Sequence, residues 1–175
     1  WKEFETAFWE EEVSAGRLRH QRSSLFINHW LISRTGEEVV AREVFSRFKS
    51  YADHDAGVPI DELLRQLSLA ARTYRSITEA AANSSGPIDA VGLFSYRIGA
   101  MESDVMKSVL LALLDENRER IAPATVESAL ATIETWLARR MLVRASTKNY
   151  NQLVAELVSV IRQAEASRVD QAVRN

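Results

Sequence analysis

The scarcity of glycine and proline is the feature that most limits how this chain can fold. Only 6 glycines and 3 prolines punctuate 175 residues, and alternating runs of β-branched residues are few, so the chain has little of the turn chemistry that hairpins require. Apolar residues instead recur at helical spacing. The sequence therefore predicts an all-α fold: a single multi-helix globular domain of about seven or eight helices, spanning residues 1–175.

Helix boundaries follow from the apolar stripes and from the few breakers. Gly36 is predicted to end a helix that begins near Ser24, while Pro59 and Pro123 are predicted to open two long helices. The other expected elements are helices over 37–53, 88–99, 105–114, 123–144 and from 150 into the tail, a turn at 53–57, a loop at 83–87, and a helix cap at Ser103 and Asp104. The stripes predicted to face the core are Val40, Val44, Phe45, Phe48 and Tyr51; Leu63, Leu64, Leu67, Ala70, Ala71 and Tyr74; and Val126, Leu130, Ile133, Leu137 and Met141.

The first nine residues carry aromatic side chains at helical spacing. Trp1, Phe4, Phe8 and Trp9 predict a helix that is already under way at residue 1. Neither an initiator methionine nor the basic-then-apolar pattern of a signal peptide stands before them. We therefore expect the chain to be a segment of a longer multidomain protein.

Composition excludes several classes of protein. A chain of this length can bury roughly 70% of its unfolded surface, so its core needs no disulfide or structural metal. There is no cysteine, which removes thiol nucleophiles, Cys-ligated zinc and iron–sulfur clusters, and fits the reducing cytoplasm. The longest apolar runs, such as Val109 to Leu114, are far shorter than the roughly 20 residues that span a bilayer. We expect no membrane partner.

The sequence contains no complete catalytic motif. The six glycines are isolated, none precedes a lysine, and no Gly-x-Ser-x-Gly elbow is present. The one compact set of possible metal ligands, Asp53-His54-Asp55, is more typical of a solvated turn, and His29 beside Trp30 is expected to be a partly buried packing residue. The sequence therefore predicts no catalytic residue, no metal and no cofactor in this segment.

Charge placement is more informative than the net charge of −2. Acidic residues are absent from 13–36 and from 135–155, and these two stretches hold the candidate nucleic-acid-binding residues Arg17, Arg19, Arg22, Arg139, Arg140, Arg144 and Lys148. One hypothesis is contact with the DNA backbone. The other, which the acidic balance favours, is internal pairing with the acidic first helix, with Glu127, Glu134 or Glu156, or with helix C-termini.

Residues 133–142 resemble the helical signature near the end of the N-terminal unit of the GmrSD-type, modification-dependent restriction endonucleases. That signature typically reads Glu, a hydroxyl residue, an aromatic, a branched apolar residue and then paired arginines; here Glu134, Trp136, Arg139 and Arg140 match it. Residues 146–151 and the apolar helix 153–161 are similar to the continuation of the same family, and residues 16–26 and 31–36 give a second resemblance.

The resemblance implies phage defence and DNA restriction for a bacterial parent protein. Members of the family carry a ParB-like, nucleotide-hydrolysing domain with an Asp-Gly-Gln-Gln-Arg motif before the helical region, and many carry an HNH-type nuclease domain after it. Neither motif occurs here. The resemblance assigns no catalytic role to Glu134, Trp136, Arg139 or Arg140, which we interpret as an intramolecular clasp or as a contact to another domain.

Two functional hypotheses from different classes follow. The first is a non-catalytic helical scaffold of a GmrSD-like protein, with other domains of the parent chain and DNA as its partners. The second is a protein-interaction adaptor without a nucleic-acid role, in which an exposed aromatic first helix docks a partner. Salt separates the two, because phosphate contacts weaken steeply as salt is added.

Overall fold

The structure is a computed structural model that describes residues 4–15, 18–82, 89–146 and 148–174. Its α-helices are α1 (Ala7–Glu10), α2 (Arg22–Thr35), α3 (Val44–Ser50), α4 (Ile60–Ala82), α5 (Ala90–Ala100), α6 (Lys107–Leu113), α7 (Pro123–Leu142), α8 (Tyr150–Gln163) and α9 (Val169–Arg174). One antiparallel hairpin, β1 (Glu12–Ala15) with β2 (Leu18–Gln21), is the only sheet in the described residues. The predicted all-α class is confirmed.

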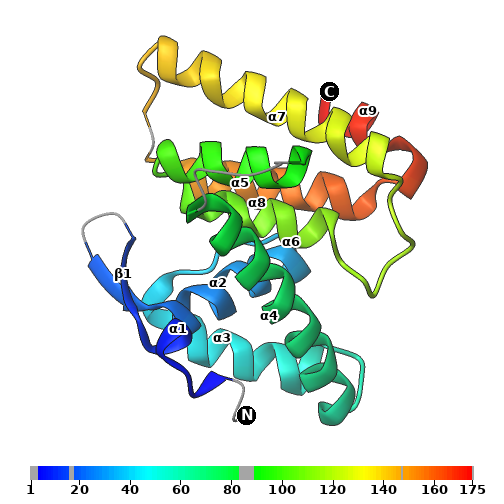
Figure 1. Ribbon diagram of the computed structural model, residues 1–175. Helices are drawn as coiled ribbons and strands as arrows, with labels where there is room; N and C mark the ends of the chain where they lie inside the picture. The colour runs from blue at the N-terminus through cyan, green and yellow to red at the C-terminus, as the bar shows by residue number, and fades with distance from the viewer. Residues whose placement is uncertain (1–3, 16–17, 83–88, 147, 175) are drawn as a thin grey trace.

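The helices form two stacked groups (Figure 1). The lower group holds α1, the hairpin, α2 and α3, and the upper group holds α5 to α9, with α4 leaning against the lower group and reaching toward the upper one. α6 lies where the groups meet and contacts α2, α4 and α8. One continuous apolar core therefore runs through both groups.

α6 has no solvent face. All its residues, from Lys107 to Leu113, are buried, because apolar side chains point in every direction around this short helix. α2 is similar over its middle, where Phe26, Trp30 and Ile32 are each at most 2% exposed. Burial of side chains of this size stabilises a fold by about 1.5–3 kcal/mol each, so α2 and α6 anchor the packing.

The N-terminal helix is much shorter than predicted. It covers only Ala7–Glu10, and Trp1 lies outside the described residues. Its aromatic face is not a free docking surface: Trp9 is 4% exposed and its ring lies 5.2 Å from that of Phe26. The expectation of an exposed aromatic first helix is wrong for the described part of α1, because these rings pack against α2 and α4.

The hairpin that follows α1 was not predicted. Its register pairs Glu12 with Gln21 and Ala15 with Leu18. Its sequence lacks the alternation of apolar and polar residues that usually signals a half-buried strand. The burial of its side chains agrees with this, since Glu12 and Arg19 are exposed and Val13 and His20 are only half-buried.

The helix expected over 37–53 is also wrong in its first part. Helical structure starts only at Ala41, as a 3₁₀ turn, and continues past α3 as a π-helical turn, Tyr51–Asp55, where a loop-like turn was expected. Asn28 donates a 2.7 Å hydrogen bond to the Val39 carbonyl, which holds this segment extended. As a result Val39 is buried, while the predicted core residues Val40 and Phe45 are 46% and 74% exposed.

The helix expected from residue 150 into the tail ends at Gln163, and a 3₁₀ turn, Ala166–Arg168, separates it from α9. The other helices match the prediction within a few residues. α4 and α7 begin at or next to Pro59 and Pro123, as expected, although Leu64 and Met141 are exposed rather than buried. Ser103 makes no cap hydrogen bond, and a 3₁₀ turn, Asp104–Met106, leads into α6 instead. The side-chain cap belongs to Asp89, which accepts from the Gly92 amide (2.7 Å) at the start of α5.

An arginine–carboxylate pair at the inner end of α2 joins distant segments. Arg34 pairs with Asp115 after α6 at 2.5 Å and with Gln66 of α4. Arg162 of α8 approaches the same carboxylate at 3.6 Å and donates to the Ser33 carbonyl. The pair is largely buried, so loss of either partner leaves an uncompensated charge.

Gly36 ends α2 in the left-handed region, as predicted, with φ of 66°. A Cβ here would lie 3.0 Å from Ser159 Cβ on α8. Gly57 has almost the same φ, 64°, but a Cβ there would meet nothing within 4 Å.

We predict that Gly57→Ala costs about 1–2 kcal/mol of unfolding free energy, from backbone strain alone. Gly36→Ala should cost at least about 1 kcal/mol more, because α2 and α8 must also move apart. Urea unfolding followed by circular dichroism measures both, and equal losses would show that α8 yields freely.

Candidate functional site

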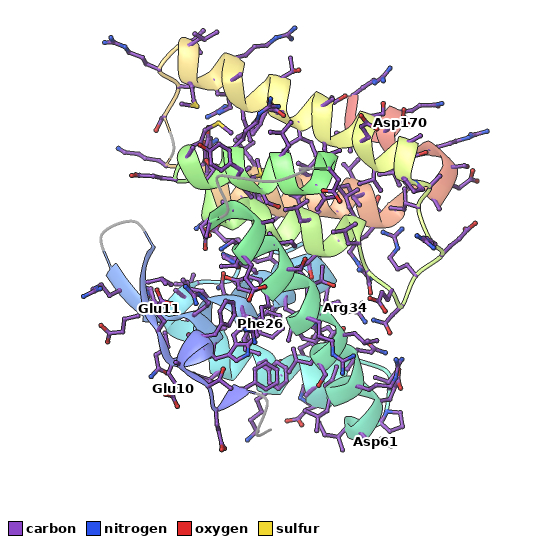
Figure 2. The ribbon with its side chains drawn as sticks, viewed as in Figure 1. Glu10, Glu11, Phe26, Arg34, Asp61 and Asp170 are labelled. Atoms are coloured by element: carbon purple, nitrogen blue, oxygen red, sulfur yellow. The ribbon has the colours of Figure 1, made fainter. Side chains whose placement is uncertain are left out.

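The cations of the first acid-free stretch, on the hairpin and at the start of α2, have different surroundings. Arg22 is 12% exposed; it donates to the Phe8 carbonyl, pairs with Glu11 at 2.8 Å and lies over the Phe8 ring. Figure 2 shows Glu11 beside the hairpin, at the end of α1. Arg19 is 69% exposed, with Glu12 3.9 Å away, and Arg17 lies outside the described residues. Arg22 is therefore occupied internally, while Arg19 faces solvent.

Arg140 on α7 closes an internal clasp. Its Nη2 donates a 2.7 Å hydrogen bond to the Ser146 carbonyl, and its guanidinium lies 5.2 Å from the ring centres of both Trp136 and Tyr150. The two rings are themselves 6.0 Å apart. The clasp thus fixes the turn between α7 and α8 with residues of the signature helix.

Glu134 of the signature does not pair with either of the adjacent arginines. It forms an ion pair with Arg97 of α5, which ties α7 to α5. The sequence analysis proposed Glu134 as an internal partner of the candidate arginines, but its ion-pair partner is Arg97.

Three cations of the signature region stay exposed. Arg139, Arg144 and Lys148 are solvent-exposed, and within the described ranges no carboxylate oxygen lies within 4 Å of their charged nitrogens. Arg144 follows the helix end with φ of 49°. Between them the apolar residues Met141, Leu142 and Val143 are 55%, 84% and 74% exposed. We call Arg139, residues 141–146 and Lys148 the α7 tip.

A groove of about 750 Å³ runs along α7 and α8 next to the α7 tip. Trp136 and Arg139 line it from α7, Leu157 and Glu156 line it from α8, and Val173 of α9 lies at one end. We call it the α7–α8 groove. It is the place where the described structure brings two residues of the sequence signature together with an apolar hollow.

A second set of polar residues, which the sequence analysis missed, lies between α2, α4 and α6; His29, Lys107 and Tyr74 are buried, and the Asp104 side chain is 37% exposed. Lys107 Nζ lies 2.5 Å from Asp104 Oδ1 and 5.0 Å from the Tyr74 ring centre. His29 Nε2 lies 4.0 Å from Asp104 Oδ2. The signal that could have revealed this cluster is Lys107 itself, a single cation within an otherwise apolar run.

Burial controls the ionisation of this cluster. It lowers the pKa of His29 from 6.5 to about 4, with Lys107 acting in the same direction and Asp104 against it. Burial alone would raise the pKa of Asp104, but His29, Lys107 and Arg22 more than offset this and leave it lowered. The pKa of Tyr74 is raised well above its ordinary value by burial and then by Asp104. At neutral pH the cluster is an ion pair beside a neutral imidazole.

Within the described residues, no three His, Asp or Glu side chains gather in a way that would hold a metal ion. No helix in the described ranges combines the length and apolar character needed to cross a membrane.

We compared the chain with protein-family models, with curated proteins and with solved structures, and none of the three comparisons gives a match. The resemblance of residues 133–151 to the GmrSD-type family stays a prediction from the sequence. Function is therefore inferred from the geometry of the α7 tip and the α7–α8 groove.

We predict opposite outcomes for the paired arginines. Arg140→Ala should lower the unfolding free energy by about 1–3 kcal/mol, because it removes a hydrogen bond and two ring contacts. Arg139→Ala, one residue away but exposed, should change it by less than about 0.5 kcal/mol. Urea unfolding compares the two, and a cost at Arg139 equal to that at Arg140 would contradict the clasp.

We also predict an acid-sensitive core. His29 binds protons with a lower pKa folded than unfolded, so stability is fully present above about pH 6.5 and falls as pH drops toward 4, by about 3 kcal/mol. His29→Gln should flatten this part of the stability curve, whereas the exposed His54→Gln should leave it unchanged. Urea unfolding at successive pH values measures the slope; an equal slope in both variants would exclude His29 as the cause.

Proposed function

We propose that the chain is a non-catalytic α-helical region of a GmrSD-like restriction protein. In this proposal it supports a nucleotide-hydrolysing domain of the same protein and contacts the DNA backbone. The resemblance of the signature helix supports the family assignment, and the clasp gives a physical reason why that signature combines an aromatic residue with an arginine one helical turn later.

The observation that supports the DNA contact is that cations at the α7 tip are exposed and form no ion pair within the described residues. Arg144 and Lys148 are exposed and lack a carboxylate partner within the described residues, and the surrounding sequence, 135–155, holds no acidic residue. Cations that are not used internally are free to replace the counterions of a phosphate backbone. Figure 1 shows the hairpin, which carries Arg19, on the same side of the molecule as the C-terminal end of α7.

The supporting role is favoured by the apolar part of the same tip. Met141, Leu142 and Val143 are three consecutive large apolar residues with 55–84% exposure. Isolated exposed apolar residues are ordinary, but a contiguous group next to a groove is typical of a protein–protein contact.

The test is binding of a short fluorescein-labelled DNA duplex, followed by anisotropy across a salt series. We expect micromolar or weaker binding that falls steeply with salt. Arg144→Gln with Lys148→Gln should make the log–log salt slope shallower by about two. Arg72→Gln, an exposed arginine of α4, is the matched control and should leave the slope unchanged.

The second candidate is an adaptor without a nucleic-acid role, and the exposed Met141–Val143 group favours it as well. Duplex binding that is absent at low salt, or that does not respond to the Arg144 and Lys148 changes, would overturn the DNA contact and leave the adaptor.

A further inference from the structure

The α7–α8 groove is open along its length rather than enclosed. Ala131 and Thr135 on α7 and Glu156 and Val160 on α8 line it and are all exposed. Sites for small ligands bury 70–90% of the ligand surface, which an open groove does not achieve. A helix suits it better, because only one face of a helix has to be covered.

The structure itself shows that this groove accepts a helix. α9 lies against α7 and α8 at the end of the groove, with Val169 fully buried and Val173 in the groove wall. Asp170 lies on α9 beside α7 in Figure 2, where it accepts a 3.1 Å hydrogen bond from Ser128. At this end of the groove, α7 and α8 therefore already hold a third helix against both of them.

The groove has a definite length. From Ser128 to Arg139 the lining of α7 spans twelve residues, and the eleven steps between them cover about 16 Å at 1.5 Å per step. An occupant of about three helical turns fills it.

Two opposite charges in the groove lack partners of opposite charge among the described residues. Arg139 has no carboxylate within 4 Å. Glu156 accepts a 3.0 Å hydrogen bond from Gln152 on its own helix but forms no ion pair. Arg139 belongs to the α7 tip, whereas Glu156 lies six residues into α8, which leads away from the tip because α7 and α8 run in opposite directions (Figure 1).

We propose that the α7–α8 groove binds an amphipathic helix of about three turns, supplied by the domain that this chain supports. Its apolar face covers Trp136 and Leu157, a carboxylate side chain meets Arg139, and a cationic side chain meets Glu156. This proposal rests on the supporting role proposed above. It takes Arg139, a nucleic-acid candidate in the sequence, as a protein contact and leaves Arg144 and Lys148 to DNA.

The probe is a pair of hydrocarbon-stapled 15-residue peptides, since unstapled peptides of this length are marginal helices in water. Both carry leucine at positions i, i+3, i+4 and i+7. The first has Glu near one end and Lys one turn away, and the second has these two residues exchanged. Peptide binding to the full chain is measured by calorimetry and by Trp136 fluorescence, with Trp136→Phe identifying that signal.

We expect the wild-type chain to bind the first peptide, and the Arg139→Glu variant to bind that peptide about fivefold more weakly. Arg139→Glu combined with Glu156→Lys should reverse the preference between the peptides, which a loss of folding cannot do. Ala131→Trp should block both peptides by filling the groove, and Arg72→Glu should affect neither.

Failure of both peptides to bind, or affinities that ignore the charge exchange, would overturn the groove proposal. The DNA experiment separates the two proposals. Salt-dependent DNA binding without peptide binding removes only the helix site, and peptide binding without DNA binding removes only the DNA contact.

Discussion

The burial of α6 on every side is the constraint on which the rest of the structure depends. A helix with no solvent face needs neighbours all around it, and α2, α4 and α8 supply them. Because α2 belongs to the lower group and α8 to the upper one, covering α6 helps to join the two groups, together with the direct contacts of α4 with α5 and of α2 with α8. It also forces Lys107 into the interior, where the adjacent Asp104 carboxylate and the Tyr74 ring stabilise its charge.

The paired arginines show how helix geometry divides work between neighbours. Successive residues on an α-helix point about 100° apart, so Arg140 turns toward Tyr150 and the Ser146 carbonyl while Arg139 faces the groove. The Arg140 guanidinium makes contacts within the fold, whereas the Arg139 guanidinium is accessible to a partner. Paired arginines in such a helix therefore carry two separate roles, and substitution of both together would mix an effect on stability with an effect on binding.

Most of the helices could be predicted from sequence because each combines a clear apolar stripe with a local stop or start. Gly36 and Pro123 mark helix ends for backbone reasons that do not depend on the rest of the fold. The hairpin and the start of the segment after Gly36 could not be predicted in this way. Their conformations depend on contacts across the chain: Arg22 with Glu11, and Asn28 with the Val39 carbonyl.

The candidate site was predictable only in part. The absence of acidic residues from 135–155 identified the cations of the α7 tip. Which of the candidate cations make internal contacts depends on their neighbours in the folded structure, and sequence spacing does not predict these neighbours. Arg22 and Arg140 are occupied, whereas Arg144 and Lys148 are not. The groove is less visible still, since its walls come from three helices, and the His29 cluster draws on α2, α4 and the turn before α6.

The position of α2 in the chain has a consequence for biosynthesis. α6 and α8, which cover α2, are made about 80 and 130 residues after it. Before then, α1, α3 and α4 are the only helices made among those that contact α2 in the described structure, so much of the apolar surface at Phe26, Trp30 and Ile32 is still open. Apolar surface that is exposed in this way during synthesis favours aggregation until the covering helices are made.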